Sequence, residues 1–371
     1  ASDIHIEPEE KGTFLRYRID GVLYDGAPPP KQWEAAIISR IKIMAGMDIA
    51  ERRLPQDGRI QVRYSDTEVD FRVSTFPTIY GENISIRVLD KSAILLKLED
   101  LGFEPKVLAR FKELLNIPHG ILLVTGPTGC GKTTTLYSAL RTINAVEKNV
   151  ITLEDPVEYR IGRIRQAQVD AKAGLTFANG LRSILRQDPD IILIGEIRDL
   201  ETSEIAIHAA LTGHMVFSTL HTNDAPGALT RLVDMGVEPF LAASSVAAVL
   251  AQRLVRRLCP KCKEPYPATP EILKSLGVDS TEGKKITLYR AKGCAECKET
   301  GYRGRTGTYE LMETSDVIRD LLLKKSSSRA LKEQAVAQGM MTLRRAGVIK
   351  VLAGVTTVEE VLRVTESELG G

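Results

Sequence analysis

The chain has 371 residues, 43% of them hydrophobic and 26% charged, which is typical of a folded protein with room for two or three domains. Its formal net charge of +2 excludes the strongly basic balance of proteins that bind nucleic acid or anionic membranes through charge alone. No run is apolar enough for a membrane span, and the acidic opening lacks the features of a signal peptide.

The first part of the chain predicts a small α+β domain, residues 1–97. Polar and apolar residues alternate over 14–19, where the turn pair Asp20-Gly21 follows, and again over 59–64, 68–74 and 83–89. Apolar residues recur at helical spacing over 33–44. We therefore expect one sheet with one helix, followed by a linker or docking segment at residues 98–104.

Residues 105–371 predict a second domain, built on a parallel sheet. Four short apolar runs, at 121–124, 150–153, 191–194 and 215–218, are separated by helical segments. Continuous apolar strands of this kind are buried on both faces, as in a doubly wound α/β sheet. The weakly polar stretch 241–250 is interpreted as a buried helix, and residues 311–371 as C-terminal helices.

A glycine-rich loop follows the first of these apolar runs. The sequence Gly126-Pro127-Thr128-Gly129-Cys130-Gly131-Lys132-Thr133-Thr134 contains the complete phosphate-loop pattern G-x-x-x-x-G-K-[ST]. Its backbone N–H groups are expected to surround the phosphates of ATP, Lys132 to reach the β and γ phosphates, and Thr133 to ligate Mg²⁺. This context of strand, loop and helix makes a chance match a poor explanation.

Acidic residues end the next two strands, at the sheet edge where such folds bind ligands. Glu154 and Glu158 follow the second run, and Glu196 follows the third, where Gly195 stands in place of the usual Asp. A carboxylate there can hold Mg²⁺ or orient the attacking water. The alternative is that these acids cap helices.

Two histidines, His214 and His221, bracket the fourth run. Beside a phosphate loop such a residue is either a γ-phosphate sensor or a structural histidine. Spacing alone leaves both interpretations open.

Four of the five cysteines form two C-x-x-C pairs, Cys259/Cys262 and Cys294/Cys297. Two such pairs predict a structural Cys₄ zinc site within residues 256–310, with redox-active pairs as the alternative. The basic residues around the first pair are interpreted as a solvated face rather than a docking site; they are Arg253, Arg256, Arg257, Lys261 and Lys263.

Together these motifs resemble the secretion ATPase superfamily, and within it the assembly ATPases of type IV pili and type II secretion systems. The resemblance rests on the phosphate loop, on residues 151–159, on residues 185–190 with 195–199, and on residues 212–223, in that order. Residues 2–8 and 54–59 match the family's second N-terminal domain, so the resemblance covers essentially the whole chain.

The resemblance implies a RecA-like ATPase domain after a PAS-like N-terminal domain. It implies that Arg72 and Arg87 reach the phosphates, with Arg59 as a third candidate. It makes Glu154 the candidate for orienting water, places Glu196 on the Mg²⁺ side, and favours His221 over His214 as a catalytic residue.

The same resemblance implies a homohexameric motor at the cytoplasmic face of the inner membrane. Its partners would be an inner-membrane platform protein and docking proteins, so that it meets the membrane only through them. Members usually carry a further N-terminal docking domain. The cysteine pairs favour an assembly ATPase over a pilus retraction ATPase. A nucleic-acid translocase is the other alternative, against which stand the balanced charge and the lack of a basic-aromatic stretch.

Overall fold

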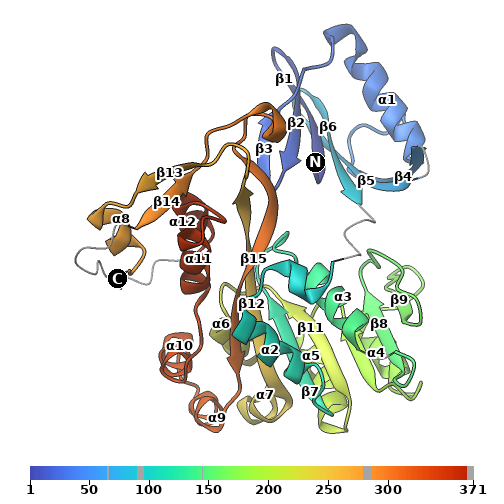
Figure 1. The fold of residues 1–371 in the computed structure, drawn as a ribbon. Helices are drawn as coiled ribbons and strands as arrows, with labels where there is room; N and C mark the ends of the chain where they lie inside the picture. The colour runs from blue at the N-terminus through green and yellow to red at the C-terminus, as the bar shows by residue number, and fades with distance from the viewer. Residues whose placement is uncertain (65–66, 90–95, 144, 279–285, 366–371) are drawn as a thin grey trace. The chain divides into compact units, whose positions relative to one another are not determined.

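The computed structural model describes residues 1–64, 67–89, 96–143, 145–278 and 286–365. Contacts within the chain divide it into two compact units, residues 1–93 and 94–371, and each is described by itself (Figure 1). No described helix combines the length and the apolar character that a membrane-spanning segment needs.

The first unit is a six-stranded antiparallel sheet with one helix. The sheet order is β3-β2-β1-β6-β5-β4, and the strands are β1 (Asp3–Glu9), β2 (Gly12–Ile19), β3 (Val22–Asp25), β4 (Gln56–Tyr64), β5 (Thr67–Thr78) and β6 (Gly81–Leu89). The short helix η1 (Lys31–Trp33) leads into α1 (Glu34–Met44). The predicted strands and helix are confirmed, and β1 and β3 are strands that alternation did not reveal.

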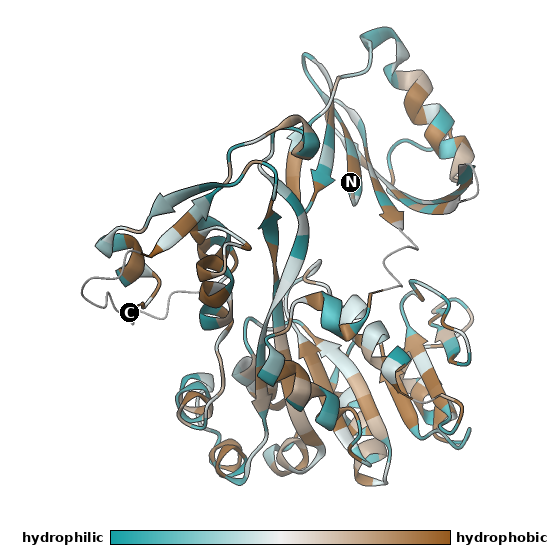
Figure 2. Ribbon diagram, in the orientation of Figure 1, coloured by the Kyte–Doolittle hydropathy of each residue, from teal (hydrophilic) through white to brown (hydrophobic). Residues whose placement is uncertain are grey.

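The two faces of this sheet differ in polarity. Side chains from one face, among them Ile6, Ile60, Val73 and Ile84, form a buried cluster with apolar residues of α1. Hydrophobic and hydrophilic residues alternate along α1, as expected for a helix with one buried face (Figure 2). The opposite face of the sheet therefore carries the polar residues, since successive side chains of a strand point to opposite sides.

The second unit contains a seven-stranded sheet, ordered β15-β12-β7-β11-β10-β8-β9. Strands β7 (Gly120–Thr125), β8 (Val150–Glu154), β9 (Arg165–Gln168), β10 (Ile191–Ile194), β11 (Met215–Leu220) and β12 (Val246–Leu258) are parallel, and β15 (Tyr302–Glu313) pairs antiparallel with β12. All four predicted apolar strands are confirmed. Strands β7, β11, β10 and β8 are neighbours in that order and run parallel. The carboxyl ends of β11, β10 and β8 therefore lie at the same edge of the sheet as the phosphate loop, which follows β7.

Helices cover both faces of this sheet. On one face a cluster joins strand residues such as Leu122 to η3 (Leu98–Leu101), α2 (Pro105–Leu114) and α3 (Lys132–Thr142). On the other face residues such as Ile121 pack against α4 (Phe177–Ile184), α5 (Leu200–Leu211), α6 (Ala225–Asp234), α7 (Pro239–Ser245) and the C-terminal helices. The C-terminal helices are α9 (Asp316–Leu323), α10 (Ser328–Ala337), α11 (Leu343–Leu352) and α12 (Val358–Val364).

One prediction for this unit is wrong. The stretch 241–250 is not one helix, because α7 ends at Ser245 and Val246–Leu250 begin β12; a short apolar run alone does not separate a buried helix from a buried strand. The segment 98–104 was expected to be a linker or a docking segment, and Leu98 and Leu101 are buried in the core of the second unit.

Along the sequence, the cysteine pairs lie between β12 and β15, which are neighbouring strands of the main sheet. Leu258 of β12 pairs directly with Tyr302 of β15, and the chain between them forms the hairpin β13 (Glu264–Pro267) and β14 (Thr287–Arg290), helix α8 (Pro270–Ser275) and the short helix η4 (Ala295–Cys297). Residues 302–310, predicted as part of the zinc subdomain, therefore belong to the main sheet. Residues 311–313, predicted as helical, complete β15.

Candidate active site

The phosphate loop joins the end of β7 to the start of α3, as the sequence predicted. Gly126, Gly129 and Gly131 have φ values of 148°, 78° and 93°, a region that other residues rarely adopt. A Cβ on Gly126 would lie 2.6 Å from the Gln252 carbonyl oxygen, whereas a Cβ on Gly129 would have nothing within 4 Å. The loop is therefore packed at its base and open at its middle, where a phosphate can approach the backbone.

Lys132 and Cys130 have different roles in this loop. Lys132 Nζ donates to the carbonyl oxygens of Gly126 at 2.7 Å and Pro127 at 3.3 Å, so the ammonium group lies over the loop. Burial lowers the pKa of Lys132, and the nearby Cys130 and Glu196 raise it in part. Cys130 is buried, and that burial raises the pKa of its thiol. Only its backbone is therefore suited to bind a phosphate.

Glu196 and His221 lie close to Lys132, at the carboxyl ends of β10 and β11. His221 Nε2 is 3.6 Å from Glu196 Oε2, and Arg198 forms an ion pair with the same carboxylate. Burial lowers the pKa of His221, and the charge of Lys132 acts in the same direction. The structure thus brings together an imidazole, a carboxyl group and the loop lysine. Glu196 does not cap a helix, because Asp199 caps α5.

Glu154 ends β8 and is only 3% exposed. Its carboxylate accepts hydrogen bonds from the Tyr137 hydroxyl, from Thr152 Oγ1 at 2.5 Å and from Gln166 Nε2 at 3.2 Å. The same hydroxyl of Tyr137 accepts from the backbone N–H of Glu158 at 3.3 Å. Glu154 is therefore engaged by donors from α3, β8 and β9, and it anchors the loop that carries Glu158.

The segment after β11 is fixed to the phosphate loop strand. The backbone N–H of Thr222 donates to Thr125 Oγ1 at 2.9 Å, and the two threonine hydroxyls are 2.8 Å apart. His214 lies at the other end of β11, where its Nδ1 is 2.8 Å from the carbonyl oxygen of Ala209. Of the two histidines, only His221 is therefore near the loop, and His214 has a structural contact.

Gln252 and Arg253 of β12 also contact the loop, and motif analysis missed both. Gln252 Nε2 donates to the carbonyl oxygen of Cys130 at 2.7 Å, and Arg253 Nη2 donates to the carbonyl oxygen of Asn223 at 2.7 Å. Only 8% of Arg253 is exposed, so the prediction of a solvated basic face is wrong at this position. No local signal distinguishes Arg253 from its neighbours, because its partners are distant in sequence.

Arg256 and Lys263 contradict the same prediction. Arg256 forms an ion pair with Glu360 at 2.7 Å and lies 4.0 Å from the ring centroid of Tyr302. Lys263 Nζ donates to the carbonyl oxygen of Gly354 at 2.8 Å. Arg256 therefore attaches β12 to α12, and Lys263, which follows the first cysteine pair, attaches its segment to the turn after α11.

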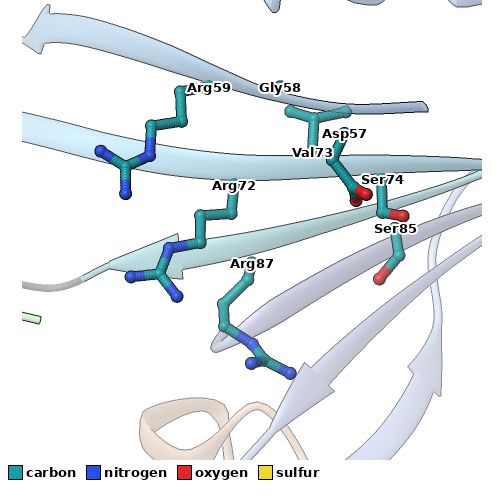
Figure 3. Close-up of a pocket in the computed structure, with 8 residues that line it drawn as sticks. All are labelled: Asp57, Gly58, Arg59, Arg72, Val73, Ser74, Ser85 and Arg87. Carbon is teal, nitrogen blue, oxygen red and sulfur yellow. The ribbon is translucent and has the colours of Figure 1, made fainter. Parts of the chain in front are cut away.

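Arg72 and Arg87 lie in the first unit, on its polar face. Arg59, Arg72 and Arg87 are directly opposite one another on β4, β5 and β6. Figure 3 shows the side chains of Arg59 and Arg72 extending in the same direction, while the side chain of Arg87 turns the other way. They line a hollow of about 480 Å³ together with Asp57, Gly58, Val73, Ser74 and Ser85. Arg87 also pairs with Asp3 at 3.2 Å. Such a row of guanidinium groups suits a polyanion.

The four predicted zinc ligands converge. The sulfur atoms of Cys259, Cys262, Cys294 and Cys297 all lie within 4.8 Å of one another. Three of their separations are 4.0, 3.8 and 3.7 Å, close to the roughly 3.8 Å expected between thiolates at Zn–S bonds of about 2.3 Å in a tetrahedron. The backbone N–H groups of Cys294 and Gly301 both donate to Cys297 Sγ at 3.2 Å, which supports a thiolate. The donor set fits zinc.

Comparison with known proteins adds independent information. The family model described as "Type II/IV secretion system protein" matches residues 1–363. The chain is 55% identical over 368 residues to the type II secretion system protein E of Pseudomonas aeruginosa, covering 99% of this chain and 73% of that protein. It is 52% identical over 364 residues to the type IV pilus assembly ATPase PilB of Myxococcus xanthus, covering 98% of this chain and 64% of that protein.

Among solved structures, the fold is similar to that of the pilus retraction motor PilT with bound ADP. The TM-score is 0.61 and the identity 26%, and the match covers 99% of this chain and 94% of that one. The second unit is thus a RecA-like domain.

Proposed function

The chain belongs to the type II/IV secretion system protein family, and on that premise we propose that it is the motor ATPase of a type IV pilus or a type II secretion pseudopilus. One observation carries the proposal. A match over nearly the whole chain, at more than half identity, links it both to a secretion protein and to a pilus assembly ATPase. The site geometry agrees, because the phosphate loop, Glu196 and His221 are close together.

In this proposal the phosphate loop holds Mg·ATP. The backbone N–H groups of residues 128–134 bind the phosphates, and Lys132 pairs with the β and γ phosphates. The Thr133 hydroxyl and the Glu196 carboxylate are hard oxygen donors of the kind that Mg²⁺ prefers, and the bound metal neutralises charge on the phosphates. His221, close to Glu196, is placed to sense the γ-phosphate.

Glu154 remains the proposed residue for orienting water, with one condition that the structure adds. Its carboxylate is buried and accepts three hydrogen bonds. Oε2 accepts only the bond from Tyr137 and keeps one acceptor site, so Glu154 can act on a water molecule only when that molecule reaches this buried oxygen.

Arg72 and Arg87 are proposed to complete the site from the first unit. The proposal is supported by the family resemblance and by the row of guanidinium groups on one sheet face. An arginine that neutralises charge in the transition state contributes about 10³–10⁵ to the rate of phosphoryl transfer.

Zinc in the Cys₄ cluster is proposed to be structural, because four thiolates leave no open coordination position. We further propose a homohexamer that acts at the cytoplasmic face of the inner membrane and drives a platform protein there. These finer assignments rest on the family resemblance, since the names of the matched family and relative state only secretion and pilus assembly. The cysteine cluster favours assembly over retraction.

Steady-state phosphate release by the purified chain, with and without Mg²⁺, tests the proposal. We expect turnover that requires Mg²⁺ and that Lys132→Ala abolishes, while Arg141→Ala, an exposed change at the far end of α3, leaves it unchanged. Wild-type turnover by Lys132→Ala would refute the assigned site. A rate that DNA stimulates, with a steep loss as salt rises, would instead identify a nucleic-acid translocase.

A further inference from the structure

Arg253 occupies a position that links two parts of the site. The pairing of β12 with β7 ends at Ala251 and Thr125, so Gln252 and Arg253 continue directly alongside the start of the phosphate loop. Arg253 Nη1 would lie 3.1 Å from a Cβ on Gly126, which places the guanidinium group against the loop's first residue.

The guanidinium group donates in two directions. Nη1 donates to the carbonyl oxygen of Gln252 at 3.1 Å, and Nη2 donates to that of Asn223 at 2.7 Å. Gln252 in turn donates from Nε2 to the carbonyl oxygen of Cys130 at 2.7 Å. These contacts connect the first residue of the phosphate loop and its middle residue, Cys130, to the segment 221–223, which carries His221.

We propose that Arg253 is a positioning residue for ATP hydrolysis. It holds the segment 221–223 in a fixed relation to the phosphate loop, so that His221 stays beside Glu196 and Lys132. This inference rests on the proposed ATPase function. The geometry favours arginine, because its planar guanidinium group holds donors on two separate nitrogens in a fixed arrangement, whereas all the donors of lysine leave a single nitrogen on a flexible stem.

Charge and geometry have separable effects at this position. Besides burial, the charge of Arg253 contributes to lowering the pKa of Lys132, so the two cations lie near each other. Two neighbouring cations favour the binding of a polyanion such as a triphosphate. Lysine at 253 keeps that attraction and loses the two-point contact, whereas methionine loses both.

The test compares Arg253→Lys with Arg253→Met in the full chain, measuring kcat, KM and the stoichiometry of a bound non-hydrolysable ATP analogue. For Arg253→Lys we expect kcat to fall about tenfold or more while KM changes by less than about threefold, the pattern of a lost alignment. For Arg253→Met we expect the same loss in kcat together with weaker nucleotide binding.

Arg256→Lys is the matched control. Arg256 lies on the same strand and is similarly enclosed, but its partners are Glu360 and Tyr302. We expect this variant to lose thermal stability and to keep the wild-type kcat per bound nucleotide.

The outcomes separate this proposal from the function on which it rests. If Lys132→Ala hydrolyses ATP normally, the proposed site itself fails. If Lys132→Ala is inactive and Arg253→Lys keeps the wild-type kcat per bound nucleotide, the positioning role alone is overturned. A loss of analogue binding by Arg253→Lys, with normal turnover in the fraction that still binds, also overturns it, because Arg253 then supports only the fold.

Discussion

Tyr137 connects the helix that follows the phosphate loop with the end of β8. Its hydroxyl donates to Glu154 and accepts from the backbone N–H of Glu158. Burial, followed by the nearby charge of Glu154, raises the pKa of Tyr137, so the phenol stays protonated and remains a donor. A single hydroxyl therefore satisfies a buried carboxylate and positions the loop after it.

Replacing Tyr137 with phenylalanine should reveal the size of this effect. The change removes one donor from a buried carboxylate and leaves the ring in place, so we expect the free energy of unfolding to fall by about 1–3 kcal/mol. Urea denaturation, monitored by far-UV circular dichroism, measures the free energy of unfolding of both proteins. A change of less than about 0.5 kcal/mol would mean that water replaces the hydroxyl without cost.

The element α12 is held to β12 by a buried carboxylate. Glu360 is 1% exposed and accepts from the backbone N–H and side chain of Arg256, as well as from Arg363. Burial alone would raise its pKa, but these donors together lower it to about 2. The unfolded chain therefore binds the proton more readily than the folded chain between pH 4.5 and 2.

The pH dependence of stability should report this helix attachment. The contribution of Glu360 is fully present above about pH 5 and is lost as the pH falls towards 2, a change of about 3 kcal/mol. Glu360→Gln should therefore be less stable than the wild type at pH 7, and the difference should narrow over that acidic range. Denaturant unfolding of both proteins at each pH measures it, and a constant difference would contradict the assignment.

The cysteine segment, residues 259–301, provides a second prediction at the scale of single elements. Cys294→Ser should lose the metal, because three thiolates bind zinc less tightly than four, and metal analysis should find about one zinc in the wild type and less in the variant. We expect a lower unfolding temperature with an unchanged KM for ATP. Equal zinc content in the two proteins would refute the Cys₄ site.

Sequence patterns predicted the elements whose signal lies within their own few residues. The four apolar runs are the central parallel strands. The phosphate loop joins a strand to a helix as expected, and the two cysteine pairs converge. The strand beginning at Val246 was mistaken for a helix, since an apolar run has no visible period when both faces are buried. Arg253 was missed because Gly126 and Asn223, which lie against its guanidinium group, are far from it in the sequence and come beside it only when the chain folds.

At the scale of the whole molecule, the two units carry different charged groups. The second unit carries the phosphate loop and the carboxylates, and the first unit carries a row of arginines on the face that α1 does not cover. The proposed function assigns both sets to one reaction.

Arg72→Ala should therefore lower kcat by about 10- to 10³-fold with little change in nucleotide affinity, because charge neutralisation in the transition state is lost. Arg40→Ala is the matched control, since Arg40 is exposed on α1, which packs on the opposite face. Phosphate release and analogue binding measure the two effects. Equal rates for Arg72→Ala and the wild type would remove Arg72 from the site.

The pairing of Leu258 with Tyr302 has an evolutionary consequence. The chain leaves the sheet for the cysteine segment and returns to it at directly opposite residues. A recombination event that exchanged residues 259–301 for a tight turn would preserve every ladder hydrogen bond between β12 and β15. It would expose the apolar residues that the segment covers on α11 and α12, among them Val351 and Val361. Such an exchange would therefore also require polar residues at those positions of α11 and α12.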